Sequence, residues 1–174
     1  MATKKKPDSQ RICVMGVAGA GKTTVGTLLA DALGSAYLEG DDLHPAESVR
    51  RMAQGIPLTD EDRGPWLDAI ASRIARAKRS DAGLVVSCSA LKRSYRDTLR
   101  RADGDMRFVH LVGDAPLIAQ RLARRAGHFM PATLLESQLA TIEIPAPDEH
   151  AWTFDVADTP EAIVARIVGR LTQR

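Results

Sequence analysis

The chain has 174 residues, a formal net charge of +2 and 26% charged residues. This length fits one α/β domain with a sizeable core. The balanced charge gives no argument for a nucleic-acid partner, and no apolar stretch approaches the length of a membrane span, so we expect neither nucleic acid nor membrane as a partner.

The first ten residues are polar, include three consecutive lysines and have no apolar segment behind them. This pattern predicts a disordered tail over residues 1–10 and not a signal peptide. We expect residues 11–174 to form a single domain. Cys13 and Cys88 both lie in apolar runs, which is typical of buried, reduced thiols, and we therefore expect a cytoplasmic protein.

Residues 16–23 read Gly-Val-Ala-Gly-Ala-Gly-Lys-Thr, which is the spacing of a phosphate-binding P-loop. An apolar run over 12–15 predicts a buried strand before this loop, and apolar residues at helical spacing follow it as far as Gly34. We expect Lys22 to reach the β- and γ-phosphates of ATP and Thr23 to be a ligand of Mg²⁺. The residues predicted to bind the nucleotide are Gly16, Val17, Ala18, Gly19, Ala20, Gly21, Lys22, Thr23 and Thr24.

Strand-like and helical patterns alternate along the chain. The strand candidates are residues 11–15, 36–39, 83–88, 107–111 and 152–156. Helical patterns lie around residues 66–74, 117–122 and 163–171, the last entered through Thr159 as N-cap with Pro160 in the first turn. This alternation favours an α/β fold with a parallel sheet covered on both faces.

Two segments interrupt the alternation. Residues 40–65 contain His, Pro, Gly and many charged residues, and we expect them to form a substrate-binding segment. Residues 121–131 are rich in Arg and contain a glycine and a proline, which predicts a mobile lid.

An acidic run, residues 39–42, follows the second strand candidate. Ligands of parallel α/β sheets bind at the carboxyl ends of the strands, where the P-loop also lies. Glu39 could therefore hold Mg²⁺ through water, and Asp41 could accept a proton from an attacking hydroxyl. The alternative is an exposed turn that caps the next helix. His44 follows; it is either an ordinary loop histidine or a hydrogen-bonding partner of the substrate.

Cationic side chains occur at three further places. Arg63 follows acids that fit the first turn of a helix, and it either binds an anionic group of the substrate or neutralises those acids. The third strand candidate ends in Ser87 and Ser89, where a Walker-B ATPase would place an Asp, and Lys92 and Arg96 follow. Hydroxyls and cations at this position suit a polar, negatively charged small molecule.

Arg121 and Arg125 lie four residues apart in the predicted lid, and thus on one helix face. Arginines of a lid can neutralise the charge of a transferring phosphoryl group, so these two are candidate catalytic residues. Arg124 is then a solvent-facing residue. The alternative is a basic helix surface with no role in catalysis.

Together these stretches resemble one family, the gluconate kinases of the small-molecule P-loop kinases, which are related to shikimate and nucleoside-monophosphate kinases. The P-loop is generic, whereas the His-Pro and Cys-Ser-Ala-Leu-Lys elements are specific to the family. The matching motifs run in family order at residues 15–23, 40–45, 55–63, 65–67, 88–92, 95–96, 127–129 and 137–138.

The resemblance implies a three-layer P-loop NTPase fold with a five-stranded parallel sheet, order 2-3-1-4-5, and a mobile lid. It implies transfer of the γ-phosphate of ATP to the 6-hydroxyl of D-gluconate, with Lys22, Asp41 and Arg121 or Arg125 in catalysis and Mg²⁺ held by Thr23 and, through water, Glu39. A homodimer is a further expectation. The implied substrate-binding residues are Asp41, His44, Arg63, Lys92, Arg96 and His128.

The sequence departs from the family at two positions. Glu39 stands where the family usually has Asp, and Ile144 stands where it often has an acid before Pro145. The first change keeps the charge but adds a methylene beside the expected metal site. The second weakens any catalytic role for that turn.

Two other functions stay open. A P-loop kinase for another small acid, such as shikimate, would use the same Asp41 and cations, although the two family-specific elements favour gluconate. A catalytically silent nucleotide-binding regulator is the alternative from another class. The chain contains no asparagine, which argues against the Asn-Lys-x-Asp element of GTP switches and leaves ATP as the expected nucleotide, with residues 158–160 as a candidate loop for adenine.

Overall fold

The computed structural model describes residues 9–124 and 133–173. Its centre is a sheet of five parallel strands, ordered β2-β3-β1-β4-β5 in space. The predicted strand order is therefore confirmed, and each strand end lies within one residue of its prediction. The strands are β1 (Arg11–Met15), β2 (Ala36–Glu39), β3 (Leu84–Ser87), β4 (Arg107–Val112) and β5 (Trp152–Asp155).

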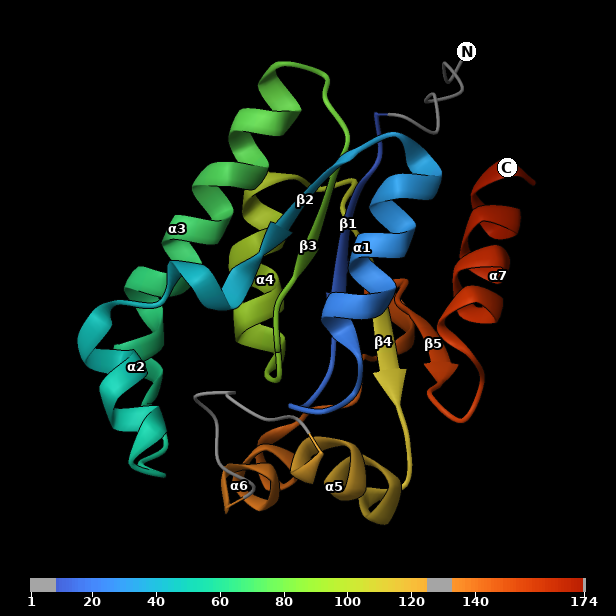
Figure 1. The fold of residues 1–174 in the computed structure, drawn as a ribbon. Helices are drawn as coiled ribbons and strands as arrows, with labels where there is room; N and C mark the ends of the chain where they lie inside the picture. Colours follow the sequence, from blue (N-terminus) through green and yellow to red (C-terminus); the bar gives the residue numbers. More distant parts are fainter. Residues whose placement is uncertain (1–8, 125–132, 174) are drawn as a thin grey trace.

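Helices cover both faces of the sheet, which gives the predicted three layers (Figure 1). Helices α1 (Lys22–Leu33) and α7 (Pro160–Thr172) pack on one face, and α3 (Asp60–Arg79) and α4 (Arg93–Ala102) pack on the other. Because side chains alternate along a strand, β1 supplies Ile12 and Val14 to one core and Cys13 and Met15 to the other.

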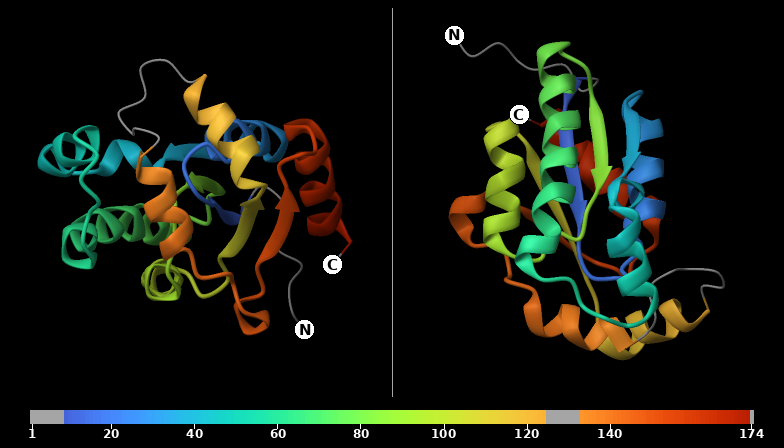
Figure 2. Two further views of the ribbon diagram at one scale, coloured as in Figure 1. Left: turned by 90° about the horizontal axis from the view of Figure 1, so that it is seen from below. Right: turned by 90° about the vertical axis from the view of Figure 1, so that its left-hand side faces the viewer.

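The 3₁₀ helix η2 (Gly40–Leu43) and α2 (Ala46–Ala53) follow β2, and α5 (Ala115–Ala123) follows β4. Helix α6 (Thr133–Thr141) and the 3₁₀ helix η3 (Pro147–Glu149) precede β5. Helices α2, α5 and α6 lie at the edge of the sheet where the strands end (Figure 2), whereas the 3₁₀ helix η3 lies beside α4, because Arg96 and Arg100 of α4 bind Glu149. Apart from η3, these segments are thus gathered at the edge where ligands of such sheets bind.

The segments outside the regular alternation take definite forms. Residues 40–65 form η2, α2 and the first turn of α3, where Thr59 and Asp62 make a reciprocal capping box. Of the predicted tail, the structure describes only Ser9 and Gln10, and both carbonyls accept hydrogen bonds. Residues 125–131 of the predicted lid lie outside the described residues. Within residues 9–124 and 133–173, no helix has the length and apolar character needed to cross a bilayer.

Candidate active site

The P-loop links β1 to α1 and directs the positive end of that helix toward the ligand position. Gly19 and Gly21 have φ angles of 81° and 92°, a backbone conformation that side chains disfavour. The first turn of α1 contains no acidic residue, so the positive end of the helix dipole can interact with a bound anion. The Lys22 ammonium donates to the Val17 carbonyl at 3.0 Å, which folds it back over the loop. This arrangement suits a phosphate chain.

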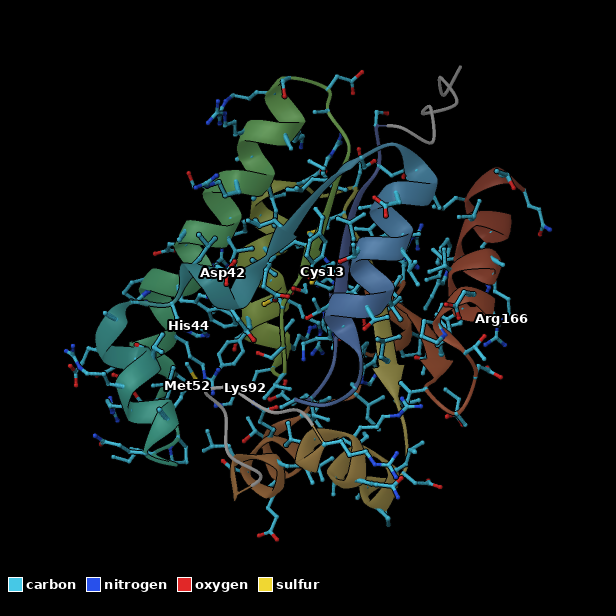
Figure 3. All side chains as sticks on the ribbon, viewed as in Figure 1. Cys13, Asp42, His44, Met52, Lys92 and Arg166 are labelled. Atoms are coloured by element: carbon cyan, nitrogen blue, oxygen red, sulfur yellow. The ribbon has the colours of Figure 1, made fainter. Side chains whose placement is uncertain are left out.

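A cavity opens beside the P-loop and brings together side chains that are distant in sequence. Among the predicted residues, Lys22, Thr23, Asp41, His44 and Arg63 line it. His44 and Met52, both labelled in Figure 3, come from the side of η2 and α2. The complete lining is Ala18, Gly19, Gly21, Lys22, Thr23, Asp41, His44, Met52, Arg63, Ser89 and Gln138.

The segment that carries Asp41 is held against α3 by Trp66. The indole Nε1 of Trp66 donates to the Gly40 carbonyl at 2.7 Å, and its ring stacks on His44 with centroids 4.1 Å apart. Burial and, to a smaller extent, the positive charge of Arg63 lower the pKa of His44 to about 4. His44 is therefore neutral at physiological pH. Its buried Nδ1 has no hydrogen-bond partner among the described residues.

Arg63 and Lys92 differ in how their charges are compensated. The Arg63 side chain faces the cavity and makes no hydrogen bond to a described residue; its Cζ lies 5.8 Å from the centre of the Tyr95 ring. The Lys92 ammonium lies 2.8 Å from both carboxylate oxygens of Asp60, which also accepts from the Tyr95 hydroxyl. Lys92 does not line the cavity, so Arg63 is the better placed of the two for a substrate anion.

Glu39 and Thr23, which were both expected at the metal, are joined by a hydrogen bond. The Oε2 of Glu39 accepts from the Thr23 hydroxyl at 2.8 Å and from the Tyr37 hydroxyl at 2.8 Å, and its Oε1 accepts from Ser87. Burial raises the pKa of Glu39, but the hydrogen bonds from Ser87, Thr23 and Tyr37 outweigh it and leave the pKa lowered. Because Thr23 donates its proton to Glu39, its oxygen lone pairs are available to a cation. An ionised carboxylate beside a hydroxyl oxygen fits Mg²⁺, which prefers oxygen ligands.

The placement of Arg96 does not support its prediction as a substrate-binding residue. Its side chain is fully buried, does not line the cavity, and forms a bidentate pair with Glu149. The same guanidinium donates to the carbonyls of Ala90 and Leu91. Ala90 has a φ of 44°, which is strained for a residue with a side chain. Arg96 therefore supports the backbone that follows β3, and it lines neither this cavity nor the second one, beside Arg121.

Arg121 lies on the other side of the P-loop from Asp41. Its guanidinium donates to the Val156 carbonyl at 2.8 Å and faces a second cavity, which does not include Asp41. This placement does not support Arg121 as the residue that closes over the phosphoryl group. The second cavity is lined by Gly19, Ala20, Gly21, Thr23, Thr24, Val25, Arg121, Val156, Asp158, Pro160 and Ile163. Arg125 and His128 lie outside the described residues.

Gln138 lines the first cavity, although no role was predicted for it from the sequence. Its Oε1 accepts from the Ala18 amide of the P-loop at 2.7 Å, in a buried contact. Gln138 belongs to α6, 120 residues away in the chain. Its position in a resembling motif was the only signal for it, because nothing local relates α6 to the P-loop.

Comparisons with known proteins bear on the family and the fold. The family described as AAA domain matches residues 12–145. The chain is 46% identical to gluconokinase of Gluconobacter oxydans over 157 residues, covering 90% of this chain and 88% of that one. The crystal structure of a gluconokinase from Sinorhizobium meliloti superposes with a TM-score of 0.85 at 47% identity, covering 95% and 93% of the two chains. Shikimate kinase from Aquifex aeolicus, at 16% identity and a TM-score of 0.60 over 94% and 97% of the chains, shares the fold.

Proposed function

The chain belongs to the gluconokinase family, and from this premise we propose that it transfers the γ-phosphate of ATP to the 6-hydroxyl of D-gluconate, giving 6-phosphogluconate and ADP. The observation that carries the proposal is that Lys22, Asp41 and Arg63 line one and the same cavity. It offers a cation for phosphate, a carboxylate for a hydroxyl, and a second cation for the acid group of the substrate.

In this proposal Asp41 accepts the proton of the 6-hydroxyl of gluconate. At the same time the oxygen of that hydroxyl forms a bond to the γ-phosphorus of ATP. The bond between that phosphorus and the β-γ bridging oxygen breaks, and ADP leaves with the electron pair. Lys22 and the amino end of α1 stabilise the negative charge on the phosphoryl oxygens. Trp66 supports this step indirectly, because it fixes the backbone of η2, which carries Asp41.

Thr23 directly, and Glu39 through water, would hold the Mg²⁺ that accompanies ATP. When bound, this ion would neutralise part of the negative charge of the phosphate groups. The second cavity, with Arg121 and residues 158–160, would take the adenosine part of the nucleotide. Arg125 stays proposed as a catalytic residue of the lid and His128 as a substrate-binding residue, and a cytoplasmic homodimer stays proposed on the family likeness alone.

Arg63 would bind the carboxylate of gluconate. It is buried, lies in the cavity and has no hydrogen-bonded carboxylate of its own among the described residues. Arginine presents paired N–H donors that match a carboxylate. Lys92 is a weaker candidate, since Asp60 occupies its ammonium.

The test is a coupled ADP-release assay with Mg-ATP and, in turn, D-gluconate, shikimate, glucose, glycerate or no acceptor. We expect ADP release that depends on gluconate, with 6-phosphogluconate as the product. Release only with another acid would keep a small-molecule kinase and overturn the substrate. Absence of release with every acceptor, from folded protein that binds ATP, would favour a silent regulator.

A further inference from the structure

Glu39 is held by two hydroxyls that do not belong to the nucleotide cradle. Besides Thr23, its carboxylate accepts from Tyr37 at 2.8 Å and from Ser87. The Tyr37 hydroxyl also lies 3.0 Å from the Ser87 hydroxyl, so the three side chains form a closed hydrogen-bonded set. We call Tyr37 and Ser87 the hydroxyl clamp.

The sheet register places the hydroxyl clamp on one face. Glu39 pairs with Ser87 across the parallel β2-β3 ladder, and Tyr37 precedes Glu39 by two residues on the same strand. Residues two apart on a strand share a face, so both partners point to the same side as Glu39. This is the face covered by α1, the helix that begins with Lys22 and Thr23.

Helix α1 leaves room for the clamp at one position. A Cβ on Gly26 would lie 2.7 Å from Cε2 of Tyr37, closer than real Cβ contacts come. The missing side chain therefore lets the Tyr37 ring lie against α1 with its hydroxyl at Glu39. The position of the Tyr37 hydroxyl at Glu39 therefore depends on the absence of a side chain at Gly26.

A glutamate needs such support more than an aspartate would. Its additional rotatable bond gives the carboxylate more positions, and only some of them meet the Thr23 hydroxyl. The clamp donates to both carboxylate oxygens, which fixes the plane of the group and turns Oε2 toward Thr23. Groups that orient the ligands of a metal in this way contribute strongly to its affinity.

We propose that Tyr37 and Ser87 are positioning residues that hold Glu39 for the Mg²⁺ of ATP. The inference rests on the proposed function, because it takes Thr23 and Glu39 as the metal-binding pair. It adds two residues that line neither of the two described cavities.

The test measures metal binding separately from turnover. The affinity of the non-hydrolysable analogue AMP-PNP is measured by calorimetry with and without Mg²⁺, and Mn²⁺ binding to the protein–AMP-PNP complex is followed by electron paramagnetic resonance. In Tyr37→Phe we expect about 10-fold weaker Mn²⁺ binding and unchanged metal-free AMP-PNP affinity. The matched control is Tyr95→Phe, which removes the only other tyrosine hydroxyl, also bonded to a carboxylate, and should leave Mn²⁺ affinity unchanged.

Glu39→Gln separates this inference from the proposed function. If Glu39→Gln weakens Mn²⁺ binding and Tyr37→Phe does not, the positioning role is overturned and the metal pair stands. If Glu39→Gln also binds Mn²⁺ normally, the metal pair itself is wrong and the inference fails with it. Ser87→Ala provides a second, independent variant should Tyr37→Phe unfold, and thermal unfolding of each variant checks that the fold is retained.

Discussion

The guanidinium of Arg96 and the carboxylate of Glu149 form a bidentate ion pair in which each side chain is only 1% exposed. The Nε–Oε2 distance is 2.6 Å and the terminal N–Oε1 distance is 2.8 Å. The pair joins α4 to η3, and Glu149 also caps η3 through the Ala146 amide. Through Arg96, it supports the turn at Ala90, next to Ser89 in the cavity.

Removing one partner should leave an unpaired charge in the interior. We expect Glu149→Gln to lower the free energy of unfolding by about 3–5 kcal/mol, the usual cost of breaking a buried pair from one side. Urea denaturation gives this value. Asp148→Asn is the matched control, since its neighbouring ion pair with Arg93 is exposed and its loss should change stability little. Equal losses in the two variants would contradict the buried role.

The same pair predicts a dependence of stability on acid pH. The hydrogen bonds from Arg96 lower the pKa of Glu149 to about 2, against about 4.3 in an unfolded chain. The contribution of Glu149 is therefore complete above about pH 4.3 and is lost as the pH falls toward 2; it amounts to about 3 kcal/mol. We expect the stability gap between wild type and Glu149→Gln to narrow over this range. Urea titrations from pH 6 to 3 measure this difference in stability. If the difference does not change with pH, the lowered pKa of Glu149 is wrong.

Arg63 and Lys92 should differ as substrate-binding residues. Arg63→Met should raise KM for gluconate by about 10-fold or more, because a hydrogen-bonded charge pair with the carboxylate is lost, and leave KM for ATP unchanged. Lys92→Met should have the smaller effect, since its ammonium already pairs with Asp60. Steady-state kinetics of both variants decides the order, and a larger effect at Lys92 would reverse our assignment.

Asp41 should matter for chemistry more than for nucleotide binding. If it accepts the proton of the attacking hydroxyl, Asp41→Asn should lower kcat by about 10²–10⁴-fold, with AMP-PNP affinity within about twofold of wild type. Single-turnover measurements with calorimetry separate the two quantities. Unchanged turnover would remove Asp41 from the mechanism.

Replacement of Lys22 tests whether the P-loop binds phosphate. Its ammonium lies over the loop, 3.0 Å from the Val17 carbonyl, so Lys22→Ala should remove a charge from the phosphate site without opening the core. We expect phosphoryl transfer to fall by at least about 10²-fold with unchanged circular dichroism and melting temperature. Wild-type turnover in this variant would refute the phosphate-binding role of the loop.

The elements that could be read from the sequence are those whose signal is local. A buried β1 has an apolar run, α7 has a threonine cap with a proline in the first turn, and the P-loop has its fixed spacing of glycines and lysine. The alternation of strand and helix patterns predicted a parallel α/β fold, whereas the strand order and gluconate as the substrate were predicted from the resemblance to the family. The local features depend on residues within one or two turns of each other, so the chain determines them without knowledge of distant contacts.

The roles of individual charged residues were decided by tertiary structure alone. Arg63 and Arg96 both sit near the start of a helix, yet only one faces the cavity. Arg96 is neutralised by Glu149, 53 residues away, and Lys92 by Asp60, 32 residues away. A buried charge needs a partner, and the fold chooses that partner across the sequence. The sequence by itself determined the family and the phosphate loop, while three-dimensional pairing decided which cations remain for a ligand.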